Sequence, residues 1–405
     1  ELLQNHRIQW ESGKRLQQSK PASSPPNTTE KNSASVKPAM FGFCELFAGI
    51  GGFRLALESL GGDCVFSSEV DKYAAETYHL NFGDLPSAGD ITTVPTEQIP
   101  PYDILVGGFP CQSFSTAGFQ QGLHDHQTTN GRLYLEVCRV LCATKPKAFL
   151  LENVANLFIM DGGKWHEDPQ QRQPGKTYTT ILTAFEKCGY IVQTQVVNAA
   201  NHHVPQHRDR LFFVGFRDSK TARCFRWPSN SSTCQTENVR TILEDYNSTA
   251  VRAAMLTDTQ YQRMQHFLKK SAGRSCRAVR LDGIARTLMA SYRAGWQKHS
   301  EFIVSSSGDS ARFYTAREAA RIMGFPDTYT IPGHPTREKG GKAYDAYQRF
   351  YHQIGNAVCP PVIKAIAESM LCAMNNMSSK KRLVENDPDS INTVKKMAVT
   401  HPTTM

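Results

Sequence analysis

The sequence predicts an α/β fold built on a doubly wound, mostly parallel sheet, with a second, smaller region late in the chain. Short apolar runs alternate with amphipathic segments of helix length, which is typical of a parallel sheet with crossover helices. A glycine-rich turn follows the first apolar run at once, at the position where sheets of this class bind ligands. With 405 residues, 40% hydrophobic and 20% charged, the chain can bury the large core that such a sheet requires.

Each predicted element corresponds to one segment of this alternation. We expect strands at residues 42–47, 64–68, 103–106, 148–151, 191–197 and 211–216. We expect helices at residues 53–60, 72–82, 133–143 and 178–188. The helices fall between the strands, as crossover connections require.

Polar segments at both ends divide the chain into five parts. Residues 1–38 and 373–405 contain few large apolar side chains and are predicted to be disordered tails. Between them we expect a main part at 39–227, a small basic region at 228–285 and a segment at 286–372 that returns to the main part. The cluster Ser379-Lys380-Lys381-Arg382 reads either as a nuclear address or as a solvated charge run.

Composition and cysteine usage narrow the class of protein. The net charge of +9 is compatible with an anionic partner such as nucleic acid. The most apolar stretch, 148–160, contains Glu152 and Asn153 and is shorter than the about 20 residues that a membrane span needs. We therefore expect no membrane span. The 11 cysteines are an odd number with no CxxC pair, which argues against a disulfide framework and against a zinc site.

The turn after the first strand is a candidate nucleotide site. It reads Phe47-Ala48-Gly49-Ile50-Gly51-Gly52-Phe53, and glycines there let the backbone approach a ligand in front of the next helix. Glu69 follows about 20 residues later, where an acidic side chain can accept both hydroxyls of a ribose. Asp90 is either a partner for an adenine amino group or an exposed turn aspartate. The turn lacks the GxGxxG of nicotinamide enzymes, and a tight connection without a ligand is the alternative.

Two strand ends carry chemically reactive side chains. Cys111 follows Gly107-Gly108-Phe109-Pro110, and a cysteine on a polar loop can be a nucleophile when a neighbour lowers its pKa or takes up charge. An isolated cysteine is more often a small buried residue. Glu152 ends the predicted strand at 148–151 on the same sheet edge, so a thiol and a carboxylate could face one substrate. The alternative for Glu152 is a cap for a following helix.

An arginine motif precedes the last predicted strand. Alternation in an extended segment places Gln206, Arg208 and Arg210 on one face. Two guanidiniums on one face suit a phosphate or an electron-rich carbonyl. A solvated, charged strand entry is the alternative.

The order and content of these motifs resemble the C5-cytosine DNA methyltransferase family, over residues 43–372. The likeness extends to three later segments, at 286–288, 317–326 and 353–358. It implies a Rossmann-like, S-adenosylmethionine-dependent methyltransferase that binds double-stranded DNA, flips the target cytosine out of the helix and uses no metal. The region at 228–285 would then recognise the target sequence.

The resemblance assigns roles residue by residue. Cys111 would add to carbon 6 of cytosine, and Glu152 would hydrogen-bond ring nitrogen 3 as charge develops. Arg210, with Arg208 beside it, would hold the carbonyl oxygen at position 2 or the flanking phosphates. On the base side it further implies Pro110, Gln112, Ser113 and Thr287. For the cofactor it implies Phe47, Gly49, Ile50, Gly51, Gly52, Glu69, Val70, Asp90, Ile91, Asn356 and Val358.

Three alternatives belong to other classes. An RNA C5-cytosine methyltransferase shares the chemistry, but the Cys-Phe-Thr tripeptide of the tRNA-modifying branch is absent from this sequence. A binding-only relative would not need Cys111 and Glu152, and a nicotinamide oxidoreductase would explain neither residue. We expect a monomer that acts in the nucleus, because long polar tails are typical of eukaryotic nuclear proteins, with the bacterial cytoplasm as the alternative.

Overall fold

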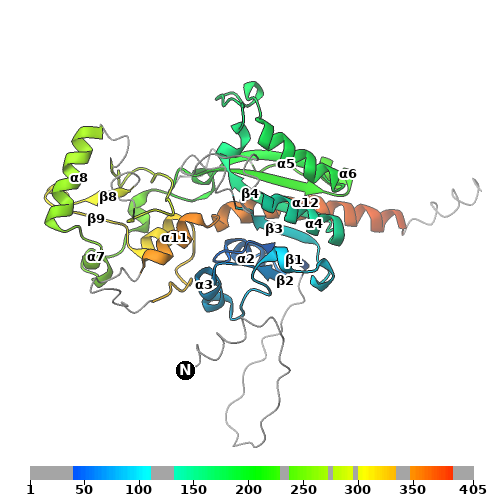
Figure 1. Ribbon diagram of the computed structural model, residues 1–405, viewed down its shortest axis with the longest axis horizontal. Coiled ribbons are helices and arrows are strands. Elements are labelled where there is room, and N and C mark those ends of the chain that lie inside the picture. Colours follow the sequence, from blue (N-terminus) through cyan, green and yellow to red (C-terminus); the bar gives the residue numbers. More distant parts are fainter. Residues whose placement is uncertain are drawn as a thin grey trace, which may run out of the picture. The chain divides into compact units, whose positions relative to one another are not determined.

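A six-stranded, mostly parallel sheet organises the larger part of the protein. The computed structural model describes residues 40–110, 132–228, 237–271, 277–294, 300–333 and 347–385, all within one compact unit, Ala39–Met405. The strand order is β2-β1-β3-β4-β6-β5, and β6 alone is antiparallel to its neighbours (Figure 1). The strands are β1 (Phe41–Leu46), β2 (Gly62–Ser68), β3 (Ile104–Gly108), β4 (Ala148–Val154), β5 (Ile191–Asn198) and β6 (Asp209–Phe216). The predicted fold class is therefore confirmed, and each predicted apolar run forms a strand.

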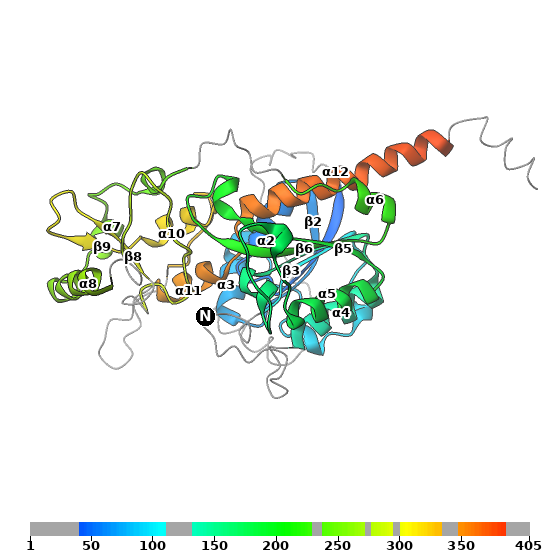
Figure 2. The same cartoon turned by 90° about the horizontal axis from the view of Figure 1, so that it is seen from above.

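Helices cover both faces of this sheet. One face carries α2 (Gly52–Glu58), α6 (Ser219–Cys224) and α12 (Pro360–Glu385). The other face carries α4 (Leu133–Thr144) and α5 (Lys176–Lys187). Figure 2 shows α12 and α6 on one side of the strands and α4 and α5 on the other. Successive residues of β1 point to opposite faces, so Phe43 packs under α2 while Cys44 packs towards α4.

Helix α3 (Lys72–Phe82) matches its predicted bounds because both of its ends are marked in the sequence. The Asp71 side chain accepts hydrogen bonds from the backbone N–H groups of Tyr73 and Ala74, and Gly83 ends the helix with a φ of 81°. Short 3-10 helices occupy several connections: η1 (Ile91–Thr93), η2 (Thr96–Gln98), η5 (Ala155–Ile159), η6 (Pro169–Gln171) and η7 (Ala199–His202).

A smaller region lies beside the large sheet (Figures 1 and 2). It contains a three-stranded sheet of order β7-β8-β9, formed by Arg277–Ala278, Glu301–Val304 and Ala311–Arg312. The neighbouring helices are η8 (Val239–Ile242), α7 (Thr249–Ala253), α8 (Asp258–Ser271), α10 (Ala316–Ile322) and α11 (Gln348–Asn356). The small sheet joins residues from both sides of the domain boundary that the sequence analysis placed between 285 and 286.

One helical segment of the described residues, 348–375, is long and apolar enough to cross a membrane by length and composition, and 44% of its most apolar window is buried. The segment spans α11 and the first half of α12. Its side chains Val362, Ile363 and Ile366 belong to the core that α12 shares with α2. The core helix of a soluble protein can be equally long and apolar. Packing against α2 accounts for the apolar face of α12.

Candidate active site

The glycine-rich turn leaves an open space in front of α2. Phe47, Gly49 and Gly51 adopt left-handed backbone conformations, with φ values of 56°, 57° and 81°. A Cβ atom added at Gly49 would meet no atom within 4 Å. The φ of Phe47 also explains why β1 ends at Leu46, one residue before the predicted end. The loop therefore has the room beside its backbone that a bound nucleotide requires.

Glu69 fixes the shape of this loop. One carboxylate oxygen of Glu69 accepts the Gly49 N–H at 2.7 Å, and the other accepts the Asp71 N–H at 2.7 Å. Burial raises the pKa of Glu69, and the two N–H donors oppose that shift. Each carboxylate oxygen has a second lone pair, so these bonds leave Glu69 able to accept a ribose hydroxyl.

Residues from the far end of the chain complete the wall of the loop. A Cβ atom at Gly52 would lie 2.7 Å from Val358 Cγ2 and 3.1 Å from the Val358 carbonyl oxygen. The Tyr329 hydroxyl donates to the Ile50 carbonyl oxygen at 2.8 Å. Asn356 is exposed at the end of α11. The structure therefore brings Val358 to the start of α2, as the resemblance implied.

The remaining predicted cofactor residues differ in exposure. Val70 is 72% exposed, whereas Ile91 is 2% exposed. Asp90 is exposed and caps η1 by accepting the Thr92 N–H at 2.9 Å. Val70 is thus an apolar surface beside the loop, and the bond to Thr92 uses only one of the two carboxylate oxygens of Asp90.

A buried carboxyl group lies below the loop, and the sequence analysis did not single it out. Glu45 on β1 is 0% exposed and accepts a 3.3 Å hydrogen bond from the Tyr78 hydroxyl. Its other oxygen has no hydrogen-bond partner. Burial raises the pKa of Glu45 from 4.5 to about 8, with Arg54 opposing the shift. Glu45 is therefore mostly protonated in the folded protein near neutral pH.

This shift makes the stability of the protein depend on pH. Because the folded-state pKa of Glu45 is the higher one, its contribution to stability is present below about pH 4.5 and is lost as the pH rises towards 8. We expect Glu45→Gln to reduce the decline in unfolding free energy between pH 5 and 8, by about 1.4 kcal/mol per unit of pKa difference. Urea denaturation at several pH values measures this decline. The exposed Glu76→Gln variant is the control, and an unchanged slope in Glu45→Gln would contradict the assignment.

The catalytic edge is formed where β3 and β4 end side by side. Gly108 pairs with Glu152, and a Cβ atom at Gly108 would lie 3.3 Å from Glu152 Oε2. The buried Asn153 side chain donates to the Phe109 carbonyl oxygen at 3.1 Å. Pro110 is half-buried. Asn153 therefore holds the backbone that leads to the predicted nucleophile, a role that sequence reasoning had not given it.

Cys111, Gln112 and Ser113 lie outside the described residues. Among the described thiols, Cys359 is the one whose pKa Glu152, Arg208 and Arg210 all influence. Burial raises the pKa of Cys359 to about 11, so this thiol stays protonated and is a poor nucleophile.

Glu152 and Arg210 form an ion pair at this edge. Arg210 Nε lies 2.8 Å from Glu152 Oε1, and the two side chains are 18% and 12% exposed. Burial raises the pKa of Glu152, while Arg210 and Arg208 lower it. A largely buried carboxyl whose pKa is raised against an adjacent cation can hold or share a proton, as a general acid requires.

Arg208 lies elsewhere than expected. It is 2% exposed, and its guanidinium donates to the backbone carbonyl oxygens of Leu288, Gly355 and Ala357 at 3.2, 3.0 and 2.8 Å. The expectation that Arg208 joins Arg210 at a substrate carbonyl or phosphate is not supported by this geometry. Gln206 is also buried and binds the Leu288 N–H at 2.7 Å. The two side chains share Leu288 as a partner, so they lie on one face, as alternation predicted.

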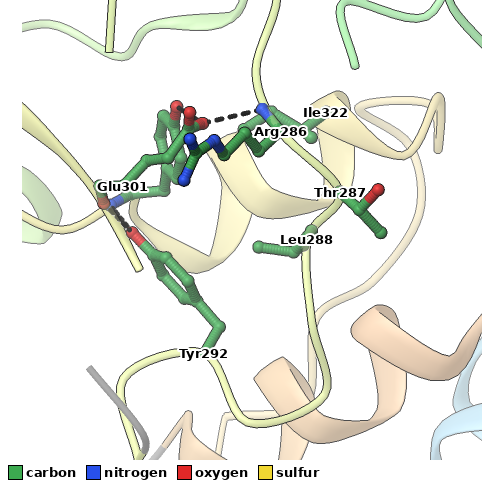
Figure 3. A pocket seen from close by; sticks show the side chains of 7 residues that line it. Arg286, Thr287, Leu288, Tyr292, Glu301 and Ile322 are labelled. Atoms are coloured by element: carbon green, nitrogen blue, oxygen red, sulfur yellow. Dashed lines mark hydrogen bonds between the residues drawn. The ribbon is translucent and has the colours of Figure 1, made fainter. Parts of the chain in front are cut away.

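A small pocket adjoins the predicted base-side residue Thr287 (Figure 3). The Thr287 hydroxyl donates to the His207 carbonyl oxygen at 2.7 Å. The buried Glu301 carboxylate accepts the Arg286 N–H at 2.9 Å, and the Tyr292 hydroxyl donates to the Glu301 carbonyl oxygen at 3.1 Å. The pocket is lined by Arg286, Thr287, Leu288, Tyr292, Glu301, Tyr314 and Ile322. In the part of the chain that the structure describes, no cluster of three or more histidine, cysteine or acidic side chains could hold a metal ion.

The sheet, the open glycine loop and the acidic residue that braces it define a Rossmann-like enzyme with a nucleotide site at the end of β1. The C-5 cytosine-specific DNA methylase family matches residues 41–372. The chain belongs to this family and is a DNA (cytosine-5-)-methyltransferase.

Two bacterial relatives are similar over nearly their whole length. Type II methyltransferase M.NlaX of Neisseria lactamica is 38% identical over 347 residues, covering 84% of this chain and 100% of its own. Type II methyltransferase M.DsaV of Dactylococcopsis salina is 34% identical over 357 residues, covering 87% and 92%. Their sources favour the bacterial alternative and give no support to the nuclear location.

Among solved structures, the Dnmt2 methyltransferase of S. pombe has the same fold. Its TM-score is 0.61 at 18% identity, over 83% of this chain and 99% of that one.

Proposed function

We propose that the enzyme methylates carbon 5 of a cytosine flipped out of double-stranded DNA, through a temporary covalent bond between Cys111 and carbon 6. The observation that carries this proposal is the placement of Glu152. Its carboxyl has a raised pKa, pairs with Arg210 and lies against the strand end that leads into Cys111. The family membership supplies the chemistry that this arrangement would serve.

Addition of Cys111 to the ring makes carbon 5 nucleophilic enough to accept a methyl group. The Cys111 thiolate adds to carbon 6, and the Glu152 proton is shared with ring nitrogen 3, so that electron density moves to carbon 5. Bound S-adenosylmethionine supplies an electrophilic methyl group. Carbon 5 takes up the methyl group and S-adenosylhomocysteine is left. A base then removes the proton from carbon 5, the double bond to carbon 6 re-forms as the carbon–sulfur bond to Cys111 breaks, and the shared proton returns to Glu152. Arg210 holds the Glu152 carboxyl in place beside the ring.

The residues at the open loop fit an adenosine and a methionine. Glu69 has free lone pairs for the ribose, Asp90 has a free carboxylate oxygen for the adenine amino group, and exposed Val70 offers apolar contact to the adenine face. Phe47, Gly49, Ile50, Gly51 and Gly52 would line the loop, with Ile91, Asn356 and Val358 completing the site. On the base side, Pro110, Gln112, Ser113 and Thr287 would contact the substrate.

Flipping is required because a stacked cytosine cannot meet both Cys111 and the methyl donor, and it costs a few kcal/mol. We further propose that 228–285 contributes to target recognition and that the enzyme acts as a monomer. The predicted tail at 373–405 begins too early, because α12 continues to Glu385 and Ala373 lies in the core; we propose tails at 1–38 and beyond α12. The basic residues of α8, which include Arg263 and Lys269, suit phosphate contacts.

A duplex containing 5-fluorocytosine tests the proposal, because fluorine replaces the proton that must leave carbon 5. We expect the wild-type protein, mixed with S-adenosylmethionine and a duplex pool that presents 5-fluorocytosine in all contexts, to form an adduct that survives denaturing electrophoresis. The Cys111→Ala variant should form none. An adduct in that variant, or no wild-type adduct at any site, would overturn the mechanism. Trapping on fluorinated tRNA in place of the duplex would assign the RNA alternative.

A further inference from the structure

Arg208 joins two segments that are far apart in the sequence. Nη1 donates to the Leu288 carbonyl oxygen, 80 residues along the chain, at 3.2 Å. Nη2 donates to the carbonyl oxygens of Gly355 and Ala357, 147 and 149 residues along the chain, at 3.0 and 2.8 Å. One planar guanidinium therefore fixes three backbone groups at once.

Each of the two joined segments belongs to a different half of the active site. Leu288 follows Thr287, which the proposed function places on the base side. Gly355 and Ala357 flank Asn356, and the next residue, Val358, packs against the start of α2 at the cofactor loop. A shift of either segment must therefore break hydrogen bonds of Arg208 or move the other segment.

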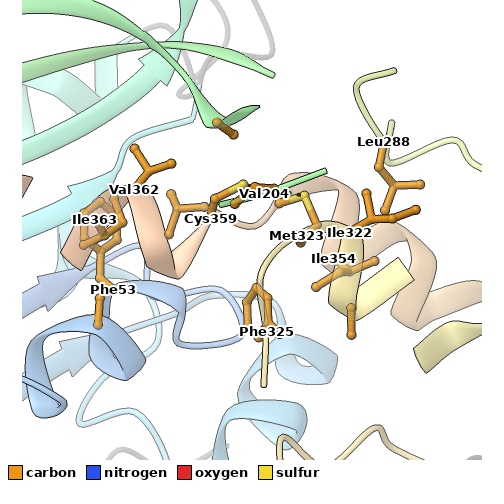
Figure 4. Packing of buried hydrophobic residues seen from close by; sticks show 14 of the residues in the cluster. Phe53, Val204, Leu288, Ile322, Met323, Phe325, Ile354, Cys359, Val362 and Ile363 are labelled. Carbon is orange, nitrogen blue, oxygen red and sulfur yellow. Dashed lines mark hydrogen bonds between the residues drawn. The ribbon is translucent and has the colours of Figure 1, made fainter. Parts of the chain in front are cut away.

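The two segments also touch directly. A Cβ atom at Gly355 would lie 2.5 Å from Ala290 N and 2.6 Å from Met289 C, so the backbones pack with no room between them. Gln206 fixes the first segment to α10 by accepting the Leu288 N–H at 2.7 Å and donating to the Ile322 carbonyl oxygen at 3.0 Å. Figure 4 shows Leu288, Ile322 and Ile354 in one apolar cluster with Met323 and Cys359. The two segments are therefore closely packed, so a shift of one segment displaces the other.

The charge of Arg208 is balanced by carbonyl dipoles. Its guanidinium donates to the carbonyl oxygens of Leu288, Gly355 and Ala357, and its Nε has no hydrogen-bond partner among the described residues. Burial and the neighbouring Arg210 lower the pKa of Arg208 to about 9, which still leaves it protonated at neutral pH. Burying a cation without a paired carboxylate costs free energy of folding. A positioning role for Arg208 would account for this cost.

We propose that Arg208 is a positioning residue that couples cofactor binding to base binding, by holding the segment at 287–290 to the segment at 355–358. The inference rests on the proposed function, because that function assigns the two segments to the base and to the cofactor. A bound cofactor that orders residues 355–358 would order residues 287–290 as well. A bound base would in turn raise the affinity of the protein for the cofactor.

Binding measurements on the full chain test the coupling. The dissociation constant of S-adenosylhomocysteine is measured alone and with saturating duplex DNA, and the ratio of the two constants is the coupling factor. We expect about 5- to 150-fold for the wild type, and a factor within about twofold of one for Arg208→Lys, since an ammonium cannot reproduce the planar fork to three carbonyls. The control is Arg217→Lys, whose guanidinium is exposed and donates to the Lys145 carbonyl oxygen at 3.1 Å.

A wild-type coupling factor of one, or an unchanged factor in Arg208→Lys, would overturn the inference. If Arg208→Lys does not fold, hydrogen exchange on the wild-type protein tests the inference instead. S-adenosylhomocysteine alone should slow exchange of the amides at 287–290 several-fold, and no change there would also overturn it. Trapping of 5-fluorocytosine by the wild type separates this failure from failure of the proposed function.

Discussion

Replacing Glu152 by glutamine is expected to lower kcat by about 10²- to 10⁴-fold, the usual contribution of a general acid. The amide can still hydrogen-bond the base, but it cannot give up a proton as charge develops at ring nitrogen 3. Single-turnover methyl transfer from labelled S-adenosylmethionine measures the effect. Circular dichroism should show that the variant is folded, since the amide still fits beside Arg210.

The pH profile separates the loss of a proton from the loss of packing. Burial raises the pKa of Glu152, and the protonated form is the active one in the proposed mechanism. Wild-type kcat should therefore fall as the pH rises through that raised pKa, and Glu152→Gln should lack this decline. The exposed Glu186→Gln variant should retain both the wild-type rate and the profile. A Glu152→Gln variant within a few-fold of wild-type activity would contradict the role.

Replacing Glu318 by alanine is expected to lower the free energy of unfolding by about 3–5 kcal/mol, because it leaves a buried arginine without its partner. Arg312 donates two hydrogen bonds to the Glu318 carboxylate at 2.7 and 2.8 Å, and the side chains are 5% and 0% exposed. The same carboxylate accepts the backbone N–H groups of Glu244 and Thr315, both at 2.9 Å. The loss is a large part of an ordinary domain stability of about 5–15 kcal/mol.

An exposed ion pair gives the matched control. Arg280 and Asp282 are 82% and 67% exposed at 3.2 Å, so Asp282→Ala should change stability by less than about 1 kcal/mol. Urea unfolding followed by tryptophan fluorescence measures both variants. Equal stabilities of Glu318→Ala and Asp282→Ala would show that the buried pair between β9 and α10 does not stabilise the fold.

Much of the fold could be predicted because local chemistry marks it. Asp71 and Gly83 bound α3. The apolar runs of β1, β3, β4 and β6 are mostly buried on both faces, so they stand out against amphipathic helices. The sequence also predicted that Glu152 ends its strand at the same edge as the strand before Cys111, since parallel strands end at one edge; the structure adds that the two strands are neighbours. This is why the candidate acid could be assigned to the same edge as Cys111.

The partners of buried side chains could not be predicted in the same way. Alternation gave the face on which Arg208 lies, but not the carbonyl groups 80 to 149 residues away that it binds. Glu45 gave no signal either, because an acidic residue inside an apolar strand becomes informative only when its burial is known. The single antiparallel strand β6 follows from the short connection after β5, which contains no crossover helix.

The packing of α12 and Val358 against α2 has a consequence for synthesis of the protein. Gly52 and its neighbours leave the ribosome well before Val358 and α12, which close around them. A nascent chain can form β1 and its glycine turn long before that turn has its far wall. Methyl donor is therefore expected to bind only after Val358 and the first turns of α12 have been made and have packed against α2, so a chain that stops before them should not bind it.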